Sequence, residues 1–479
     1  MAETIIGRDA EKKILRDMLG SGEAELIAIL GRRRVGKTFL VRNFYEQNLV
    51  FEYTGVHEAG LEEQLHNFSN ALQQAIGSAI PLASPTNWIQ AFTFLSNFLR
   101  VKLTRGRSVV LFDEFPWIQT PRSGFLSAFS HWWNTWASRQ PSLKVVICGS
   151  AASWMIENIL NDRGGLHNRV SRTIRLLPFS LKETEEFLVN RNIRLDQYQI
   201  LQLYMAMGGI PQYLKQVGKG ESTAQVIDKL FFEKSGLLKT EFANLYQSLF
   251  ANASHHEAIV RVLAKKAQGL NRTEIIEACQ FTTGGGTTRL FQELEESGFI
   301  MQYIPFGKTS RDSVYKLSDE YSLFYLKFIE NARASGSGTW HKIATGQSYN
   351  SWGGYAFEAI CQKHVPQIKQ ALGIGSVYTE ISGWRYNPKK GEKGAQIDLL
   401  LDRRDHCINL CEIKFSTDQF VIDKKYAEEF EKKINVFKTQ TKTKKSIFPT
   451  MITTYGVVKN SHYSSLIQAE VLMKDLFSR

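Results

Sequence analysis

The sequence predicts a multidomain α/β protein, with a doubly wound parallel sheet in its first half and a second α/β sheet near the C-terminus. Three observations lead to this prediction. Short apolar runs alternate with helical patterns through the first 180 residues, which is typical of parallel strands joined by helices. A glycine-rich octapeptide follows the first run. Beyond a small-residue segment at Asn331–Gly338, apolar runs return with charged residues embedded in them.

The expected strands of the first half are short and rich in β-branched and aromatic residues. The first is the run 26–30, and the stretch 39–45 that follows the octapeptide carries apolar residues at helical spacing. Later strands are expected at 50–53, 109–112, 145–148 and 173–177. Because helical patterns separate these runs, we expect one parallel sheet.

The octapeptide Gly31-Arg32-Arg33-Arg34-Val35-Gly36-Lys37-Thr38 is a complete G-x-x-x-x-G-K-[ST] phosphate-binding loop. Gly31 and Gly36 allow backbone torsions that let successive N–H groups, including those of Arg34 and Val35, turn towards a polyphosphate. Lys37 would reach the β- and γ-phosphates. Thr38 would ligate Mg²⁺, and the following helix N-terminus adds positive charge. The alternative is an ordinary glycine-rich turn, and the strand–loop–helix context favours binding of ATP or GTP.

An acidic pair, Asp113-Glu114, ends the expected strand 109–112. An acid at the carboxyl end of a strand beside a phosphate loop can hold Mg²⁺ through a water, and a second acid can polarise the attacking water. We therefore assign Asp113 to the metal and Glu114 to water activation. The competing interpretation is an acidic pair that opens a surface turn before Pro116.

Composition and charge restrict the class of protein. A chain of 479 residues with 43% hydrophobic and 22% charged residues is an ordinary globular protein of about three domains. No run has the length of a membrane span, and no signal-peptide pattern is present, so no membrane partner is expected. Five scattered cysteines predict reduced thiols and a cytoplasmic location. A zinc site at His406, Cys407 and Cys411 is disfavoured, because their spacing matches no ligand pattern.

The net charge of +12 is concentrated towards the C-terminus. Residues 340–479 contain 21 Lys and Arg against 14 Asp and Glu, which is about +7. A basic surface commonly indicates a nucleic-acid partner, although a solvated basic face has the same composition.

These motifs resemble those of the AAA+-like P-loop ATPases related to the STAND class, and more closely a family of prokaryotic ATPases with a helical lid, a winged helix and a nuclease-like tail. The resemblance implies that Ile5–Glu11, with Ile6, Gly7 and Arg8, packs against adenine, which favours ATP over GTP. It implies a γ-phosphate sensor at Ser150, after the strand 145–148.

The same resemblance implies an arginine finger and a lid. Arg169 would stabilise transition-state charge on the nucleotide of a neighbouring subunit, which implies a homo-oligomer. The alternative for Arg169 is a surface ion pair, and Arg163 is a second candidate for the finger. Gly208-Gly209 belongs to the lid motif, where glycines would allow close approach to the nucleotide.

The middle of the chain has the plan of a winged helix between about 257 and 317. Three helical patterns are followed by two short apolar stretches, 299–304 and 314–317, which look like the hairpin of a wing. The third helix, 287–294, could enter a major groove. Its acidic residues balance Arg289, so the unit is equally well interpreted as a packing module.

The C-terminal part places three charged side chains on two adjacent strands. The runs 397–401 and 409–415 are expected to form a hairpin, in which Glu412 and Lys414 share one face because strand side chains alternate. These two residues alone would be a plain salt pair. Asp398, embedded in an apolar run, adds a second carboxylate, so Asp398 and Glu412 form a candidate Mg²⁺ site beside Lys414.

This arrangement resembles the PD-(D/E)xK nucleases, in which metal ions activate a water and neutralise the scissile phosphate. The resemblance implies a further acid, Glu358, on the helical stretch 352–358, and a catalytic role for Lys414. Lysines of the stretch 424–433 would contact backbone phosphates or belong to a solvated helix. The expected domains are an ATPase core (1–178), a helical lid (179–250), a winged helix (251–330) and a nuclease-like domain (340–479).

The leading functional prediction is therefore an ATPase whose nucleotide state controls a Mg²⁺-dependent DNA nuclease. One alternative is a regulatory ATPase whose C-terminal domain binds DNA or protein without cleavage. Another is an antitoxin, defence or mobile-element factor in which a partner matters more than enzymology.

Overall fold

The computed structural model describes residues 4–478 except 162–163, 251, 283, 333–335, 387 and 389–393. The chain divides into two compact units, Met1–Leu177 and Pro178–Arg479. None of the helices in the described part is both long and apolar enough to span a bilayer.

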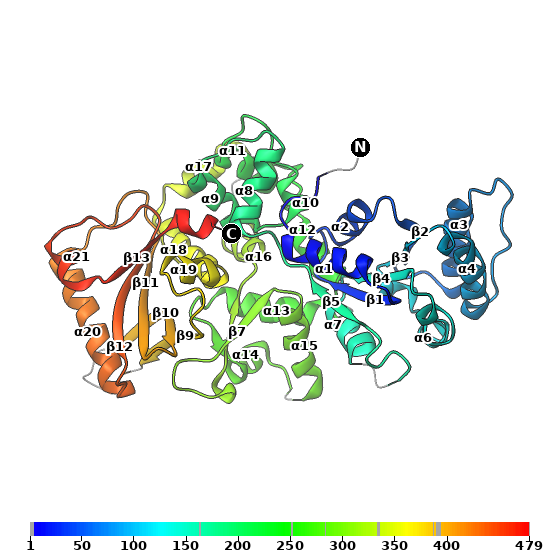
Figure 1. The fold of residues 1–479 in the computed structure, drawn as a ribbon. Helices are drawn as coiled ribbons and strands as arrows, with labels where there is room; N and C mark the ends of the chain where they lie inside the picture. Colours follow the sequence, from blue (N-terminus) through cyan, green and yellow to red (C-terminus); the bar gives the residue numbers. More distant parts are fainter. Residues whose placement is uncertain are drawn as a thin grey trace. The chain divides into compact units, whose positions relative to one another are not determined.

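The first unit is built on a parallel five-stranded sheet (Figure 1). Its strands are β1 (Glu25–Leu30), β2 (Leu49–Thr54), β3 (Ser108–Asp113), β4 (Leu143–Gly149) and β5 (Arg172–Arg175). The spatial order is β2-β3-β4-β1-β5, and every neighbouring pair is parallel. The predicted parallel α/β sheet is confirmed. The order places β4 between the strand before the phosphate loop and the strand that ends in Asp113.

Helices connect these strands, and several of them bury a large aromatic core. The helices are α1 (Asp9–Gly20), α2 (Lys37–Phe44), α3 (Leu61–Ile76), α4 (Trp88–Leu103), α5 (Phe115–Ile118), α6 (Phe125–Thr135) and α7 (Ala152–Met155). Phe92 of α4 stacks on Trp132 of α6 with ring centroids 5.1 Å apart, and both belong to a buried cluster that includes Phe112 of β3. This packing fixes β3 and therefore the position of the acidic pair at its end.

The second unit begins with a series of helices, of which α13, α14 and α15 pack against a small antiparallel sheet. These helices are α8 (Leu181–Asn190), α9 (Gln197–Met207), α10 (Pro211–Leu214), α11 (Thr223–Ile227), α12 (Glu241–Gln247), α13 (Ala253–Ala264), α14 (Arg272–Cys279), α15 (Gly285–Glu296) and α16 (Glu320–Phe324). The sheet has the order β6-β8-β7, formed by β6 (Leu270–Asn271), β7 (Ile300–Tyr303) and β8 (Val314–Leu317).

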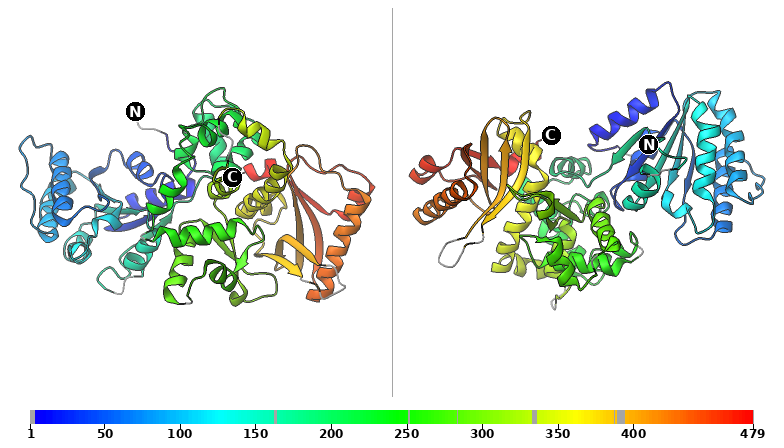
Figure 2. Two further views of the ribbon diagram at one scale, coloured as in Figure 1. Left: turned by 180° about the vertical axis from the view of Figure 1, so that it is seen from behind. Right: turned by 90° about the horizontal axis from the view of Figure 1, so that it is seen from below.

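The C-terminal part of this unit is a mixed five-stranded sheet with the order β13-β12-β11-β10-β9. Its elements are α17 (Thr339–Ala344), α18 (Gln347–Lys363), α19 (Val365–Ala371), β9 (Thr379–Tyr386), β10 (Ala395–Arg403), β11 (Cys407–Lys414), α20 (Lys424–Thr441), β12 (Ser446–Thr453), α21 (Ser461–Leu466) and β13 (Ala469–Leu472). The expected hairpin is present as the antiparallel pair β10 and β11. Figure 2 shows this sheet from two further directions, with α20 packed beside it.

The segment Asn331–Gly338, where the composition predicts a domain boundary, falls within the second compact unit. Residues 333–335 lie outside the described residues, and the chain on both sides packs together. Trp340 contacts the rings of Phe324 and Phe328, and the carboxylate of Asp228 accepts hydrogen bonds from the backbone of Gly338 and Trp340. Aromatic burial therefore packs Trp340, which follows the segment, against residues that precede it.

Gly209, expected at the lid, approaches the backbone of Phe179. The Phe179 N–H donates to the Gly209 carbonyl at 2.7 Å, and a Cβ on Gly209 would lie 2.0 Å from the Phe179 carbonyl oxygen. We expect Gly209→Ala to lower the free energy of unfolding by about 3 kcal/mol, because backbone on both sides must move. Urea unfolding would measure the loss.

Gly354→Ala on α18 is the matched control, because a Cβ there meets nothing within 4 Å. Alanine should leave the stability unchanged or raise it by up to about 1 kcal/mol, through its better helix propensity. Equal stabilities of the two variants would contradict the close approach at Gly209.

Candidate functional site

The phosphate loop joins β1 to α2 in a strained, glycine-dependent conformation. Gly36 has φ 93° directly before α2, and Arg34 has φ 70°. Gly31 has φ 156°, and a Cβ there would lie 2.4 Å from the Leu176 carbonyl oxygen. Glycine is therefore required at both ends of the loop for two different reasons: left-handed torsion at Gly36 and close backbone approach at Gly31.

Lys37 folds back over the loop. Its side chain is buried, and Nζ donates to the carbonyl oxygens of Gly31 at 2.8 Å and Arg32 at 3.1 Å. Burial lowers the pKa of the ammonium, and the charges of Glu114 and Asp113 oppose this shift. The ammonium of Lys37 thus holds the loop closed through two backbone carbonyls.

Thr38 and Asp113 meet beside this lysine. Thr38 Oγ1 donates to Asp113 Oδ2 at 2.7 Å. The other carboxylate oxygen of Asp113, Oδ1, is buried and accepts no hydrogen bond from any residue that the structure describes. Burial raises the pKa of Asp113, and the bond from Thr38 lowers it. An unpartnered carboxylate oxygen next to a hydroxyl is a donor set that Mg²⁺ prefers.

Glu114 points at the neighbouring strand end rather than into solvent. Its backbone is left-handed, with φ 44°, at the start of α5. Its Oε2 accepts hydrogen bonds from the Ser150 N–H at 3.1 Å and from the Ser150 hydroxyl. Ser150 follows β4, which lies between β1 and β3, so the three strand ends bring Lys37, Glu114 and Ser150 together.

The N-terminal element and the candidate arginines occupy different environments. Arg8 is buried with φ 57°, and it donates to the Leu177 carbonyl at 2.7 Å, while Gly7 has φ 59° and Ile6 is half-buried. Arg169 is exposed in the turn before β5. Arg163 lies outside the described residues.

Sequence reasoning missed Gly55, which supports the acidic pair. Its N–H donates to the Asp113 carbonyl at 2.9 Å, and a Cβ on it would lie 2.7 Å from the Glu114 carbonyl oxygen. A glycine directly after the strand β2 was the available signal, since glycine at a strand end permits close backbone approach.

The second candidate site lies in the C-terminal sheet, where Glu412 is the most buried acid. Only 1% of Glu412 is exposed, and its Oε1 accepts from Lys433 Nζ on α20 at 2.5 Å. Lys414 Nζ lies 3.5 Å from Oε2, and the Tyr426 hydroxyl donates to the same oxygen at 3.4 Å. Lys433, which we expected at a phosphate or in solvent, instead pairs with Glu412.

Asp398 lies on β10 where the pairing with β9 shifts register between Ile397 and Leu400. Burial, followed by the charges of Glu358 and Glu412, raises the pKa of Asp398 to about 7. The structure therefore brings Asp398 close enough to Glu358 and to Glu412 for their like charges to repel that of Asp398.

Glu358 has a partner that sequence reasoning did not find. Lys316 of β8 donates from Nζ to Glu358 Oε1 at 2.8 Å, and both side chains are largely buried. Glu358 is the main cause that raises the pKa of Lys316 against the effect of burial, and Asp398 adds to it. No local pattern reveals this contact, because 42 residues separate the two partners.

No group of three or more His, Cys, Asp or Glu side chains in the described part of the chain has the geometry of a metal cluster. Mg²⁺ is commonly held by one or two carboxylates and waters, so the pair Asp398 and Glu412 is the set to consider. A cation bound between Asp398 and Glu412 would offset the repulsion between their two negative charges.

Comparison with known proteins finds a similarity to ATPases that covers the first unit and the start of the second. Residues 6–217 match the model of a family described as an ATPase domain predominantly from Archaea. Over 419 residues the chain is 24% identical to an uncharacterized protein of Methanocaldococcus jannaschii, a match that covers 86% of this chain and 87% of the relative. This match and the phosphate loop described above support an ATP-binding P-loop ATPase in the N-terminal part of the chain.

Solved structures are more distant. A Walker-type ATPase of Pyrococcus abyssi has a TM-score of 0.49 at 18% identity, covering 68% of this chain and 96% of that one. The ORC2 protein of Aeropyrum pernix, solved as ADPNP–ADP complexes, has a TM-score of 0.41 at 14% identity, covering 68% and 94%.

Proposed function

We propose that the P-loop domain hydrolyses ATP with Mg²⁺ and that its nucleotide state controls a Mg²⁺-dependent DNA nuclease site in the C-terminal sheet. The observation that carries the ATPase half is the hydrogen bond between Thr38 and Asp113, with Asp113 Oδ1 left unpartnered. Such an oxygen is costly to bury unless a cation or water completes its coordination.

Each residue of the P-loop site has a role in this proposal. Thr38 and Asp113 would hold Mg²⁺, which supplies charge neutralisation at the phosphates. Lys37 and the loop N–H groups, with those of Arg34 and Val35, would bind the polyphosphate. Glu114 would orient the attacking water once Ser150 releases it, and Ser150 would then sense the γ-phosphate.

Further residues complete the nucleotide site. Ile6, Gly7 and Arg8 would pack beside adenine. Arg169 would act on the nucleotide of a second copy in a homo-oligomer, and its exposed position supports a role outside its own site.

At the second site, Asp398 and Glu412 would hold Mg²⁺, and Glu358 and Lys414 would assist it. The support is the electrostatic coupling of the three acids, since burial and like charge keep the pKa of Asp398 at about 7. Lys414 lies 3.5 Å from Glu412, where an ammonium can stabilise a nucleophile or a phosphate. The nuclease-like fold, the winged helix formed by α13–α15 with β6–β8, and the division into four domains belong to the same proposal.

A second candidate function is a regulatory ATPase whose C-terminal part binds DNA or protein without cleavage. One observation favours it. Lysines neutralise two of the three acids, because Lys316 pairs with Glu358 while Lys433 and Lys414 flank Glu412. A site that already holds its own cations needs no metal to be stable.

The two functions separate in a cleavage assay with Mg²⁺ or Mn²⁺, with and without ATP. We expect wild-type protein to cut DNA, and Glu412→Gln to lose on the order of 10²-fold in rate, because one electrostatic group at the reacting phosphate is removed. Glu380→Gln, an exposed acid on β9, should cut as wild type does. Lys37→Ala should remove only the ATP dependence. If wild-type protein cuts no DNA under any nucleotide condition, the nuclease proposal fails and the regulatory ATPase stands.

A further inference from the structure

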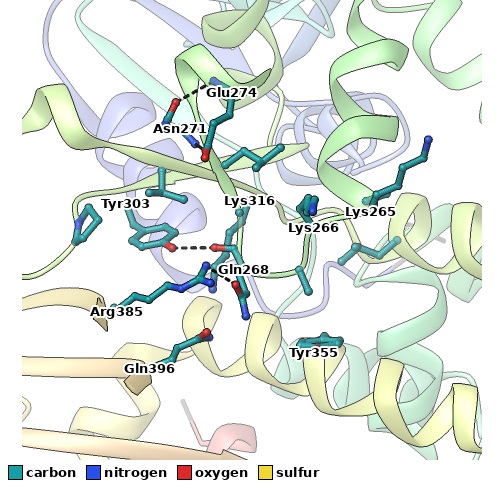
Figure 3. Close-up of a pocket in the computed structure, with 18 of the residues that line it drawn as sticks. Lys265, Lys266, Gln268, Asn271, Glu274, Tyr303, Lys316, Tyr355, Arg385 and Gln396 are labelled. Atoms are coloured by element: carbon teal, nitrogen blue, oxygen red, sulfur yellow. Dashed lines mark hydrogen bonds between the residues drawn. The ribbon is translucent and has the colours of Figure 1, made fainter. Parts of the chain in front are cut away.

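A large open cleft separates the small antiparallel sheet from the C-terminal sheet within the second unit. Its volume is about 1300 Å³. One wall comes from the end of α13, the following turn and strands β7 and β8. The other wall comes from α18, the edge strand β9 and its neighbour β10. Figure 3 shows Tyr303, Lys266 and Lys316 on the first wall facing Tyr355 and Gln396 on the second. Typical small-molecule pockets occupy roughly 300–1,000 Å³, so this cleft is large for a metabolite.

The cleft is strongly basic. Nine Lys and Arg residues line it, against three Asp and Glu. Lys265, Lys266 and Lys327 are exposed, and none of them forms an ion pair with the residues that the structure describes. Unpaired ammonium groups gathered along one cavity create a positive potential that favours a polyanion.

Aromatic side chains are interleaved with these cations. Tyr355 on α18 lines the cleft and is 52% exposed, although most large aromatic residues of this unit are buried. Trp352, one turn earlier, lines the cleft from a buried position, and its indole Nε1 has no hydrogen-bond partner among the described residues. An exposed ring and an unused donor beside unpaired lysines are the groups that bind bases and phosphates.

The cleft borders the acids of the second candidate site. Gln396 lines it, and its Nε2 lies 3.4 Å from Asp398 Oδ1. Lys316 also lines it and donates to Glu358. A chain lying along the basic cleft would therefore pass beside Asp398 and Glu358.

The helix α15, the expected recognition helix, is a weaker candidate for such contacts. Its Arg289 is bound to Glu293 at 2.9 Å, and Glu293 also accepts from His256 at 2.8 Å. The helix does not line the cleft.

We propose that this cleft binds single-stranded nucleic acid, with Lys265, Lys266 and Lys327 on the phosphates and Tyr355 stacked on a base. The strand must be single because a ring stacks only on a base whose face is free. That the bound strand is also a substrate rests on the nuclease function proposed above, whereas binding itself does not.

The test is fluorescence anisotropy with a labelled 20-nucleotide oligo-dT, the same length of oligo-U, and the dT·dA duplex, all in EDTA so that no cleavage occurs. We expect wild-type protein to bind either single strand more tightly than the duplex. The double variant Lys265→Glu/Lys266→Glu should weaken binding at least tenfold and flatten the salt dependence by about 1.4 in log–log slope, for two lost phosphate contacts. Tyr355→Ala should weaken binding about tenfold, for one lost stack.

The matched control is Lys219→Glu/Lys234→Glu, which changes the net charge equally at exposed positions of the same unit away from the cleft. It should bind as wild type does.

Absence of single-strand binding by wild type, tighter binding of the duplex, or equal losses in the two double variants would each overturn the inference. If binding depends on Lys265 and Lys266 but no cleavage occurs, the proposal that the cleft binds a single strand is supported and only the nuclease proposal fails. If cleavage occurs at the same rate in the variant that lacks both lysines, the nuclease proposal is supported and the proposed binding in the cleft fails.

Discussion

Lys37→Ala is expected to reduce ATP hydrolysis by on the order of 10²- to 10³-fold and to weaken nucleotide binding. The ammonium is buried in the loop and donates to the carbonyls of Gly31 and Arg32, within reach of the space where a polyphosphate binds. Its removal takes away the positive charge that a transferring phosphoryl group requires. Phosphate release under saturating ATP and Mg²⁺ measures the rate, and titration with a fluorescent ATP analogue measures the affinity.

Arg42→Ala on the same helix is the control for this experiment. Arg42 forms a bidentate contact with Glu52 at the surface, so its loss changes α2 without changing the loop. Turnover should stay within about twofold of wild type, since exposed ion pairs contribute little. Full hydrolysis by Lys37→Ala would contradict the assignment of the loop as the ATP site.

Asp398→Asn is expected to stabilise the metal-free protein, by an amount that increases with pH. The pKa of Asp398 is about 7 in the folded chain and 3.8 ordinarily. The folded state therefore keeps a proton that the unfolded state has lost, and wild-type stability falls as pH rises from about 4 to about 7. Asparagine carries no ionisable proton, so the variant does not lose stability through ionisation of this buried side chain. The gain should be about 1 kcal/mol at pH 4.5 and up to about 4 kcal/mol at pH 8.

Urea unfolding at both pH values in EDTA measures this gain. Asp418→Asn, at an exposed position in the same unit, should change stability by less than about 0.5 kcal/mol at either pH. A gain that is equal at pH 4.5 and pH 8 would show that Asp398 titrates normally and that the three acids do not repel one another.

Sequence reasoning predicted the phosphate loop and its strand–helix context because the signal is local. Gly31, Gly36, Lys37 and Thr38 lie within eight residues, and their torsions and contacts follow from that spacing. The partner of Thr38 was also accessible, since the carboxyl ends of parallel strands share one edge of a sheet. No local pattern specifies the order of the strands in the sheet. The sequence therefore could not show that β4 lies between β1 and β3, or that Ser150 donates to Glu114.

The C-terminal site was predictable only in part. Alternation along β11 placed Glu412 and Lys414 on one face, and the hairpin with β10 brought Asp398 near. The cations that neutralise these acids come from elements distant in sequence, Lys433 on α20 and Lys316 on β8. Burial of Glu412 depends on α20 packing over the sheet, which composition could not distinguish from a solvated helix.

The contact between Lys316 and Glu358 links the small sheet to the C-terminal acids through one carboxylate. Lys316 belongs to the small sheet, and Glu358 to the helix α18 beside the C-terminal acids. Any divalent ion that takes Glu358 as a ligand must displace the ammonium of β8. Such an ion would therefore weaken the contact between β8 and α18. Because coupling between two equilibria is reciprocal, a ligand that separates β8 from α18 would raise the affinity of the acids for the ion by the same factor.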